Sequence, residues 1–408
     1  MNLRAVRVND FGVRLFLTFC TLAPIFIYHG IFKGHETLRM GQEQFFQIGA
    51  TVLFCVILLE NVYLAAFMLW AIFLYAYYNF PQPGGSYVLN IFSTLIIYQV
   101  AYKLMSSEVF KKLKWALYFL VVLNLLWIFL QAAGLEFLFV NLDTKQVNEH
   151  LVGFFGLKAF MGMFFAMMIP IFLPHSLITL LLFVPVYFSE CSVAMVGGIA
   201  AVLWFSWNNS KKAFYALLLI LSILGGAYVI RDSKANMFSN RINLWKMALS
   251  DASVHPIIGM GLDSFRSVGD MKPYLYFNNP VTNEVMKLFY HKDTNSFVPK
   301  GDTKIPRLPN GNFSADPWDN PHNEYIKIFY EMGIIPFVIL FFLIKDIVRR
   351  FKPSPELISI IGFFIVLAIL CIGQFPLHVV RNGLFVPVFL AVYYKLTDST
   401  DLKKKAGF

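Results

Sequence analysis

The chain has 408 residues, of which 58% are hydrophobic and 17% aromatic, while only 14% are charged. Soluble domains average about 45–50% apolar and about 25% charged residues, so this composition excludes an ordinary soluble domain. The 34 Lys and Arg residues outnumber the 24 Asp and Glu residues and give a net charge of +10. Because most of this excess falls in short loops between apolar runs, we attribute it to membrane topology and not to nucleic-acid binding.

Apolar runs succeed one another along most of the chain. A helix that crosses the hydrocarbon core needs about 20 apolar residues, and about twelve such segments occur. We split the run from Phe45 to Phe80 at Glu60, because a lone carboxylate in lipid is costly. The expected fold is an all-α polytopic membrane protein with about twelve transmembrane helices. The predicted spans are residues 13–32, 45–60, 62–80, 86–102, 115–133, 153–173, 175–189, 191–208, 213–230, 325–345, 356–375 and 380–395.

A single long polar insert, residues 231–324, separates predicted spans one to nine (1–230) from spans ten to twelve (325–408). It holds eleven Lys and Arg against ten Asp and Glu and is therefore nearly neutral. Short cytoplasmic loops carry the excess of Lys and Arg, and this rule places both termini inside and the insert outside. The basic N-terminal segment has no small-residue cleavage site, so we interpret it as a retained first helix.

The insert itself contains one predicted helix, residues 240–252, in which Ile242, Trp245 and Leu249 contribute to one apolar side. Arg241 and Trp245 then share a face one turn apart. Residues 273–311 are rich in Pro, Gly, Asn and aromatic residues without a period, which predicts irregular structure.

Two arginines and one histidine of the insert are candidates for chemistry. Arg241 and Arg266 carry guanidinium groups, which bind phosphate oxygens in a bidentate manner, although interfacial arginines also contact lipid headgroups. His322 lies just before the tenth predicted span and offers an imidazole that can take a proton from a hydroxyl. The alternative is a structural histidine at a helix start.

Other polar groups near the outer side leave alternatives open. Lys158 and Lys327 lie in predicted spans, where they either reach towards the interface or contact an anionic headgroup. Asp316, Asp319 and His322 recur every third residue and are possible metal ligands, but no second carboxylate cluster completes a site. No strand is predicted before the Gly-x-Gly that ends at Gly261, which excludes a dinucleotide fingerprint.

Three segments taken together resemble the O-antigen ligase and polymerase family. They are Arg241-Ile-Asn-Leu-Trp245, His255-Pro-Ile-Ile-Gly-Met-Gly-Leu-Asp-Ser-Phe265, and Pro321-His-Asn-Glu-Tyr325 with Glu331-Met-Gly-Ile-Ile-Pro336. Residues 153–162, with Lys158, are similar to a further motif of that family, in which a Gly-aromatic pair precedes a basic residue. The chain departs from the family after Ser192, where members often carry an arginine and this sequence has Val193.

The resemblance implies a glycosyltransferase of the bacterial inner membrane. A glycan would move from undecaprenyl diphosphate to a sugar hydroxyl of lipid A-core, or of another glycan acceptor, at the periplasmic face. The leaving diphosphate supplies the driving force, so the reaction needs cations and a base but no nucleotide. Because no second carboxylate cluster completes a site, we expect the reaction to be independent of metal, and we expect no cofactor. Besides the donor and acceptor, membrane lipids are the expected partners, and nucleic acid is not.

The same resemblance assigns roles to particular residues. Arg241 and Arg266 would bind diphosphate, and His322 would act as the base or orient the acceptor. Glu324 or Asn323 would help this alignment, and the ring of Trp245 would stack on sugar. Substrate contacts are also implied for His255, Lys158 and Arg381.

Other functions remain open at this stage. A polymerase that joins lipid-linked repeats and a protein O-oligosaccharyltransferase need the same donor chemistry. A secondary transporter belongs to a different class and is favoured only by the number of spans, since transporters of the largest such class place their long loop at mid-chain.

Overall fold

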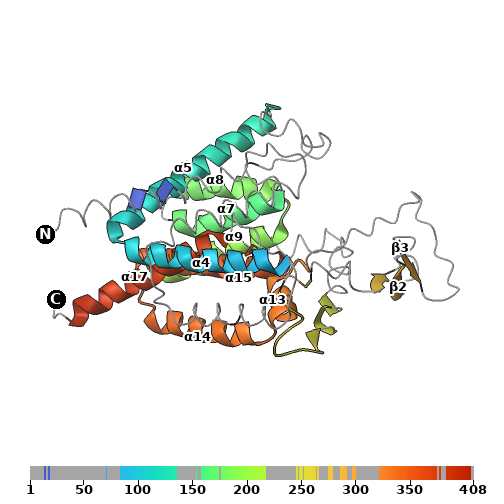
Figure 1. Cartoon of the computed structure of the whole chain (residues 1–408). Helices are drawn as coiled ribbons and strands as arrows, with labels where there is room; N and C mark the ends of the chain where they lie inside the picture. Colours follow the sequence, from blue (N-terminus) through green and yellow to red (C-terminus); the bar gives the residue numbers. More distant parts are fainter. Residues whose placement is uncertain are drawn as a thin grey trace.

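The computed structural model describes a mostly helical protein (Figure 1). The described residues are 13–14, 17–18, 70, 83–135, 153, 158–173, 176–216, 245–246, 248–250, 252–262, 264–265, 274–278, 285–291, 296–299, 321–374, 376–377 and 383–405. The described helices are α4 (Pro83–Leu104), α5 (Ser107–Ala132), α7 (Lys158–Phe172), α8 (Ser176–Phe188), α9 (Ser192–Asn209), α13 (Glu324–Met332), α14 (Ile335–Arg350), α15 (Pro355–Gly373) and α17 (Phe385–Lys405).

In their described residues, the predicted spans 86–102, 115–133, 153–173, 175–189, 191–208, 356–375 and 380–395 are mostly helical, as expected. By length and composition, two helices of the described part can cross a membrane, Glu108–Ala132 and Pro355–Gly373. Predicted spans 45–60, 62–80 and 213–230, and most of 13–32, lie outside the described residues.

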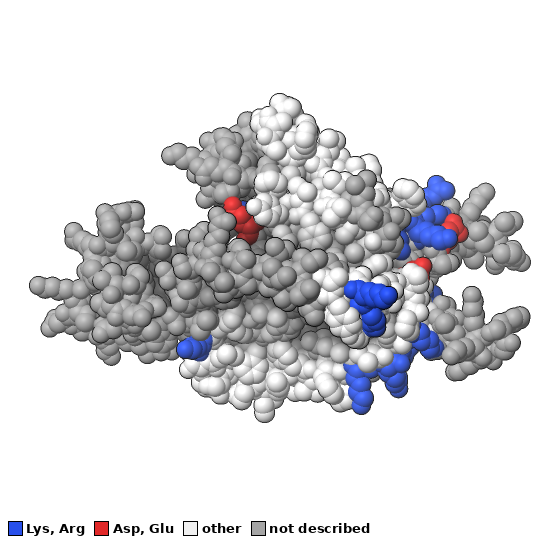
Figure 2. All heavy atoms as spheres, turned by 180° about the vertical axis from the view of Figure 1, so that it is seen from behind, with Lys and Arg blue, Asp and Glu red and all other residues white. Residues whose placement is uncertain are grey.

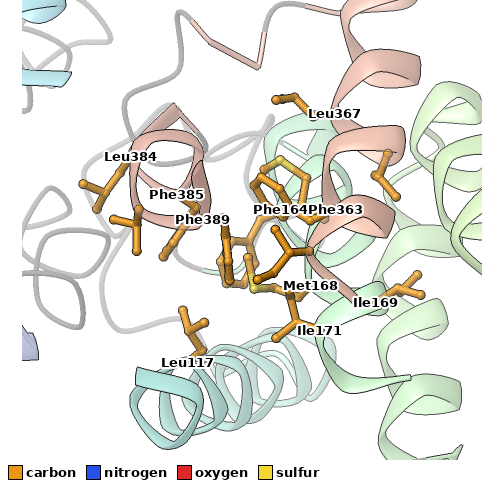
Figure 3. Close-up of a cluster of buried hydrophobic side chains, with 14 of the residues drawn as sticks. Leu117, Phe164, Met168, Ile169, Ile171, Phe363, Leu367, Leu384, Phe385 and Phe389 are labelled. Carbon is orange, nitrogen blue, oxygen red and sulfur yellow. The ribbon is translucent and has the colours of Figure 1, made fainter. Parts of the chain in front are cut away.

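α7 forms the centre of the bundle. Every residue from Met161 to Phe172 is buried, as expected for a helix that is apolar on all sides. Figure 3 shows Phe164 and Met168 of α7 among side chains of α5, α15 and α17, including Leu117, Phe363 and Phe389. α9 approaches α7 and α8 closely at Gly198, since this residue has no side chain. A Cβ there would lie 2.8 Å from Ile169 and 3.0 Å from Phe183.

The tenth predicted span is wrong as a single helix. The chain forms α13 and α14, and the break falls at Gly333, whose φ of 70° and ψ of −156° are a glycine-only conformation. Pro336 stands in the first turn of α14, where its missing N–H costs no helical hydrogen bond. Glycine after one helix and proline at the start of the next are recognised stop and start signals.

The irregular structure expected within residues 273–311 is also wrong in part. β1 (Tyr274–Asn278), β2 (Val285–His291) and β3 (Ser296–Pro299) form an antiparallel sheet of order β1-β2-β3. Tyr274 is the register partner of Phe289, and Leu288 that of Pro299. The prediction of an all-α fold therefore fails for this small sheet, whose aromatic-rich strands are separated by turn-forming residues in the sequence.

Several helices expose apolar side chains on one side. On α5, five large side chains recur at the spacing of a single helical face, and each is more than half exposed. They are Trp115, Phe119, Val122, Leu126 and Phe129. The opposite side of α5 packs into the core through Leu113, Leu117 and Leu120.

Basic side chains gather at one end of the bundle, where α4, α9 and α14 end and α5 and α15 begin (Figure 2). We call this the basic end. Its described charged residues include Lys103, Lys111, Lys112, Lys114, Lys211, Lys212, Lys345, Arg349, Arg350, Lys352 and Lys395, and also Glu108, Asp346, Glu356 and Asp398.

Candidate functional site

The first two of the three sequence segments meet the third at the opposite end of the bundle. The described residues from Trp245 to Ala252 are helical, which confirms this part of the predicted helix. Trp245 Nε1 donates a hydrogen bond of 2.7 Å to the carbonyl of Pro321, the residue before His322. Ala248 and Ala252 are fully buried against α13, whereas Leu249 is 43% exposed, so its predicted place on the apolar side is wrong.

The segment after this helix is joined to the end of α13 by backbone hydrogen bonds. Met260 N–H donates to the carbonyl of Tyr330 at 2.7 Å, and Gly261 N–H donates to that of Glu331 at 3.0 Å. In return, Ile334 N–H donates to the carbonyl of Pro256 at 3.0 Å. Residues about 70 positions apart in sequence therefore form one rigid unit, and the ring of Phe265 packs edge-on against Tyr330 beside it.

Two glycines make this docking possible. Gly259 and Gly333 both have positive φ, at 72° and 70°. A Cβ at Gly259 would lie 2.5 Å from the backbone of Glu331, and one at Gly333 would lie 2.1 Å from the carbonyl of Ile257. Each glycine thus admits the backbone of the other segment, and any side chain would separate the two.

His322 stands at the start of α13 on an unusual backbone. Its φ is 52°, in the left-handed region that few residues other than glycine adopt, and its side chain is partly exposed. Such backbone strain concentrates at functional sites. The next residue, Asn323, caps α13, because its side-chain oxygen accepts a hydrogen bond from Ile326 N–H at 3.1 Å. The cap fixes where the helix begins and so where His322 lies.

One face of α13 carries three buried ionisable residues, Glu324, Lys327 and Glu331, with exposed fractions of 0%, 2% and 0%. Glu324 Oε1 accepts a hydrogen bond from Leu377 N–H at 2.8 Å, which ties α13 to the segment after α15. Lys327 Nζ lies 3.8 Å from Glu331 Oε1. Lys327 is thus a buried partner of a carboxylate, so the alternative in which it reaches towards the interface is wrong, and contact with an anionic headgroup stays a prediction.

The N-terminus of α7 and the turn between α8 and α9 lie at this same end. Lys158, the first residue of α7, forms an ion pair with Glu190, which has a positive φ of 52°. Ser189 Oγ donates to the carbonyl of Val186 at 2.6 Å and accepts from Cys191 N–H at 3.2 Å.

This turn is joined to the end of α15. Gln374 Nε2 lies 3.9 Å from Cys191 Sγ. Val193 packs so closely on α15 that a Cβ at Gly373 would lie 2.4 Å from it. Leu377, which follows the end of α15, donates its N–H to Glu324 Oε1, so the turn between α8 and α9, the end of α15 and the start of α13 lie at the same end of the bundle.

Five of the residues predicted for the site are described at the His322 end. His322, Asn323, Glu324, Trp245 and Lys158 lie at one end of the bundle, with Asn323 and Glu324 in structural hydrogen bonds. His255 is exposed in the turn that precedes the docked segment. Arg241, Arg266, Arg381, Asp316 and Asp319 lie outside the described residues. In the described part, no three His, Cys, Asp or Glu side chains gather in a way that would hold a metal ion.

Sequence reasoning missed the pairing of Lys327 with Glu331 and the reciprocal contact of the two glycines. Lys327 and Glu331 stand four residues apart, the spacing of neighbours on a helix, and this was the available signal. The glycine contact has no local signal, because it joins distant segments. Comparison with protein-family models and with curated proteins found no match for this chain.

Proposed function

We propose that the chain is a membrane glycosyltransferase resembling O-antigen ligases, with about twelve spans and its site on the periplasmic side. The observation that carries this proposal is the meeting of the three motif segments at one end of the bundle, around Pro321 and His322. These segments were singled out in the sequence by their resemblance to that family, and hydrogen bonds of 2.7–3.0 Å join them.

Two further features support a place in the membrane. Single exposed apolar side chains are common on protein surfaces, but α5 exposes a continuous row of five. Lipid tails would cover this row. Among the described residues, Lys and Arg outnumber Asp and Glu at the basic end. At the His322 end, Lys158, Lys246 and Lys327 are matched by Glu190, Glu324 and Glu331. Short cytoplasmic loops carry such an excess, so we assign the basic end to the cytoplasm and the His322 end to the periplasm.

The proposed chemistry is an in-line transfer. The acceptor hydroxyl oxygen forms a bond to the anomeric carbon of the glycan, while the bond from that carbon to the diphosphate oxygen breaks and the diphosphate leaves with the electron pair. His322 receives the hydroxyl proton. Arg241, four residues before Trp245, and Arg266, next to Phe265, would stabilise the charge on the diphosphate.

The preferred acceptor is a sugar of lipid A-core, and a second lipid-linked repeat or a protein hydroxyl is the alternative. A transporter is disfavoured, because the long polar insert follows the ninth predicted span, whereas transporters of the largest such class place their long loop at mid-chain.

The experiment supplies purified protein in proteoliposomes with a polyprenyl-diphosphate-linked glycan and one of three acceptors: lipid A-core, a Ser-rich peptide, or none. Ligation predicts glycosylated lipid A-core, whereas polymerisation predicts longer lipid-linked glycans without an added acceptor. If the donor remains intact with all three acceptors, the proposal is wrong. Arg241→Ala should lose product, and Arg241→Lys should restore only part of it, because the guanidinium fork is lost.

A further inference from the structure

The helix α14 has two different sides at the basic end. On the inner side, the Asp346 carboxylate, 6% exposed, accepts hydrogen bonds from Arg350 at 2.9 Å and from the Tyr394 hydroxyl at 3.0 Å. Arg350 also reaches Asp398 at 2.7 Å, and the Tyr102 hydroxyl donates to Asp398 at 2.8 Å. These contacts hold α14 to α17 and α4, and they fix the direction in which its other side faces.

The outer side of α14 carries a stripe that changes from apolar to cationic. Its members, at positions i, i+3, i+4, i+7 and i+11, share one helical face. Val338, Phe341 and Phe342 are 45%, 62% and 48% exposed. Lys345 is exposed, and the Arg349 side chain is 74% exposed although it also donates to Asp346. A ligand that fits this stripe has an apolar tail and an anionic head.

We propose that this stripe binds an anionic phospholipid of the inner leaflet. The phosphate would lie between Lys345 and Arg349, and an acyl chain would run along Phe342, Phe341 and Val338. At about 1.5 Å per residue, the eleven steps from Val338 to Arg349 cover about 16 Å, close to half of a hydrocarbon core of about 30 Å. Length, polarity and the order of the two parts therefore agree with one lipid in one leaflet.

Other cations of the basic end are less suited to this role. Lys112 pairs with Glu108 at 2.9 Å, Lys211 lies 3.0 Å from the ring centroid of Trp207, and Lys395 lies 5.0 Å from that of Tyr102. Lys345 has no ion pair or ring contact within the described part of the chain. The proposal rests on the membrane placement given above, but it is independent of the transfer reaction.

The test uses the purified full chain in a neutral detergent and counts bound lipids by native mass spectrometry. Phosphatidylglycerol and phosphatidylcholine with identical acyl chains are compared, with inorganic phosphate as the third arm. Wild-type protein should bind phosphatidylglycerol selectively. The variant Lys345→Gln should weaken that binding by roughly fivefold, and Lys345→Gln with Arg349→Gln by roughly 25-fold. The matched control, Lys111→Gln with Lys212→Gln, removes two exposed cations of the same end and should change it little.

Equal binding of the two lipids, or equal loss in the control variant, would overturn the proposal. Protection of the site by inorganic phosphate alone would overturn it as well, because a lipid would then not be required. The single variant Lys345→Gln breaks no ion pair of the described part, so its result stands even if the double variant is unstable. Loss of glycan transfer with intact lipid selectivity would count against the proposed function and leave this site in place.

Discussion

The two ends of the helical bundle are held together by different interactions. At the basic end, side chains connect the helices: Asp346, Arg350 and Asp398 join α14, α17 and α4 through charged hydrogen bonds. At the His322 end, backbone hydrogen bonds connect segments that are distant in sequence. The two segments pack so closely that neither Gly259 nor Gly333 has room for a side chain. Ion pairs tolerate small shifts, whereas backbone docking does not, so the comparison predicts that the end with the candidate chemistry is the more sensitive to small changes.

The largest effect is expected from Gly333→Ala. Its backbone conformation is restricted to glycine, and the added methyl would lie against the Ile257 carbonyl. We expect a loss of about 4 kcal/mol in the free energy of unfolding and loss of glycan transfer.

Gly134→Ala is the matched control for this change. Gly134 also has a positive φ, of 77°, but nothing lies within 4 Å of the position of its Cβ. This variant should cost only about 1 kcal/mol and keep its transfer activity. Equal losses from both alanines, measured by thermal unfolding in detergent, would show that backbone strain and not docking matters.

A slightly smaller effect is expected from Lys327→Met. The substitution leaves the Glu331 carboxylate buried without its cation, and we expect a loss of about 3 kcal/mol. Adding Glu331→Leu removes the second charge and should recover part of this loss. A double variant less stable than Lys327→Met, compared by the same unfolding measurement, would contradict a simple buried pair.

At the basic end, stability should depend on pH through Asp346. Burial raises the pKa of this carboxyl, but hydrogen bonds from Tyr394 and Arg350 and the charge of Arg350 outweigh burial and hold the pKa below its usual value of 3.8. Since the pKa is lower in the folded protein, the stabilisation is present at neutral pH and is lost as the pH falls below about 4. Asp346→Asn should cost roughly 2 kcal/mol at pH 7 and flatten this acid limb. Unfolding curves with an unchanged acid limb would show that other carboxyls dominate.

The smallest effects on stability are expected from two helix caps, of which only the cap of α13 lies next to His322. Asn323→Ala and Ser354→Ala each remove a side-chain acceptor at a helix start, the first at Ile326 N–H and the second at Leu357 N–H. Each should cost about 1 kcal/mol. Only Asn323→Ala should lower transfer, because His322 precedes it. Equal activity of the two variants would mean that the start of α13 does not set the position of the imidazole.

The sequence predicted the helices well and their interruptions less well. α5, α9 and α15 follow long apolar runs, and such runs have few other stable structures. The break at Gly333 was missed although Pro336 follows it, because hydropathy continues across the break and outweighed the local stop signal. The sheet was missed because its strands have four to seven residues and interrupted alternation.

The residues of the candidate site could be predicted from sequence motifs, but the contacts between them could not. The number of residues between Trp245 and Pro321 does not predict the distance between them in space, since a chain segment of that length can fold in many ways. Lys327 shows the same limit: hydropathy placed it in a span, but only the packing of α13 shows that it is buried beside Glu331. Contacts made by backbone groups, such as Met260 with Tyr330, leave no pattern in a single sequence.

The most direct test of the proposed transfer is a comparison of wild-type protein with His322→Ala under identical conditions. Both are reconstituted with a polyprenyl-diphosphate-linked glycan and lipid A-core, and the polyprenyl diphosphate released per glycan joined to the acceptor is measured. We predict equal amounts of the two products from the wild type and neither from His322→Ala, with both proteins equally folded. Undiminished release and joining by His322→Ala would contradict the account.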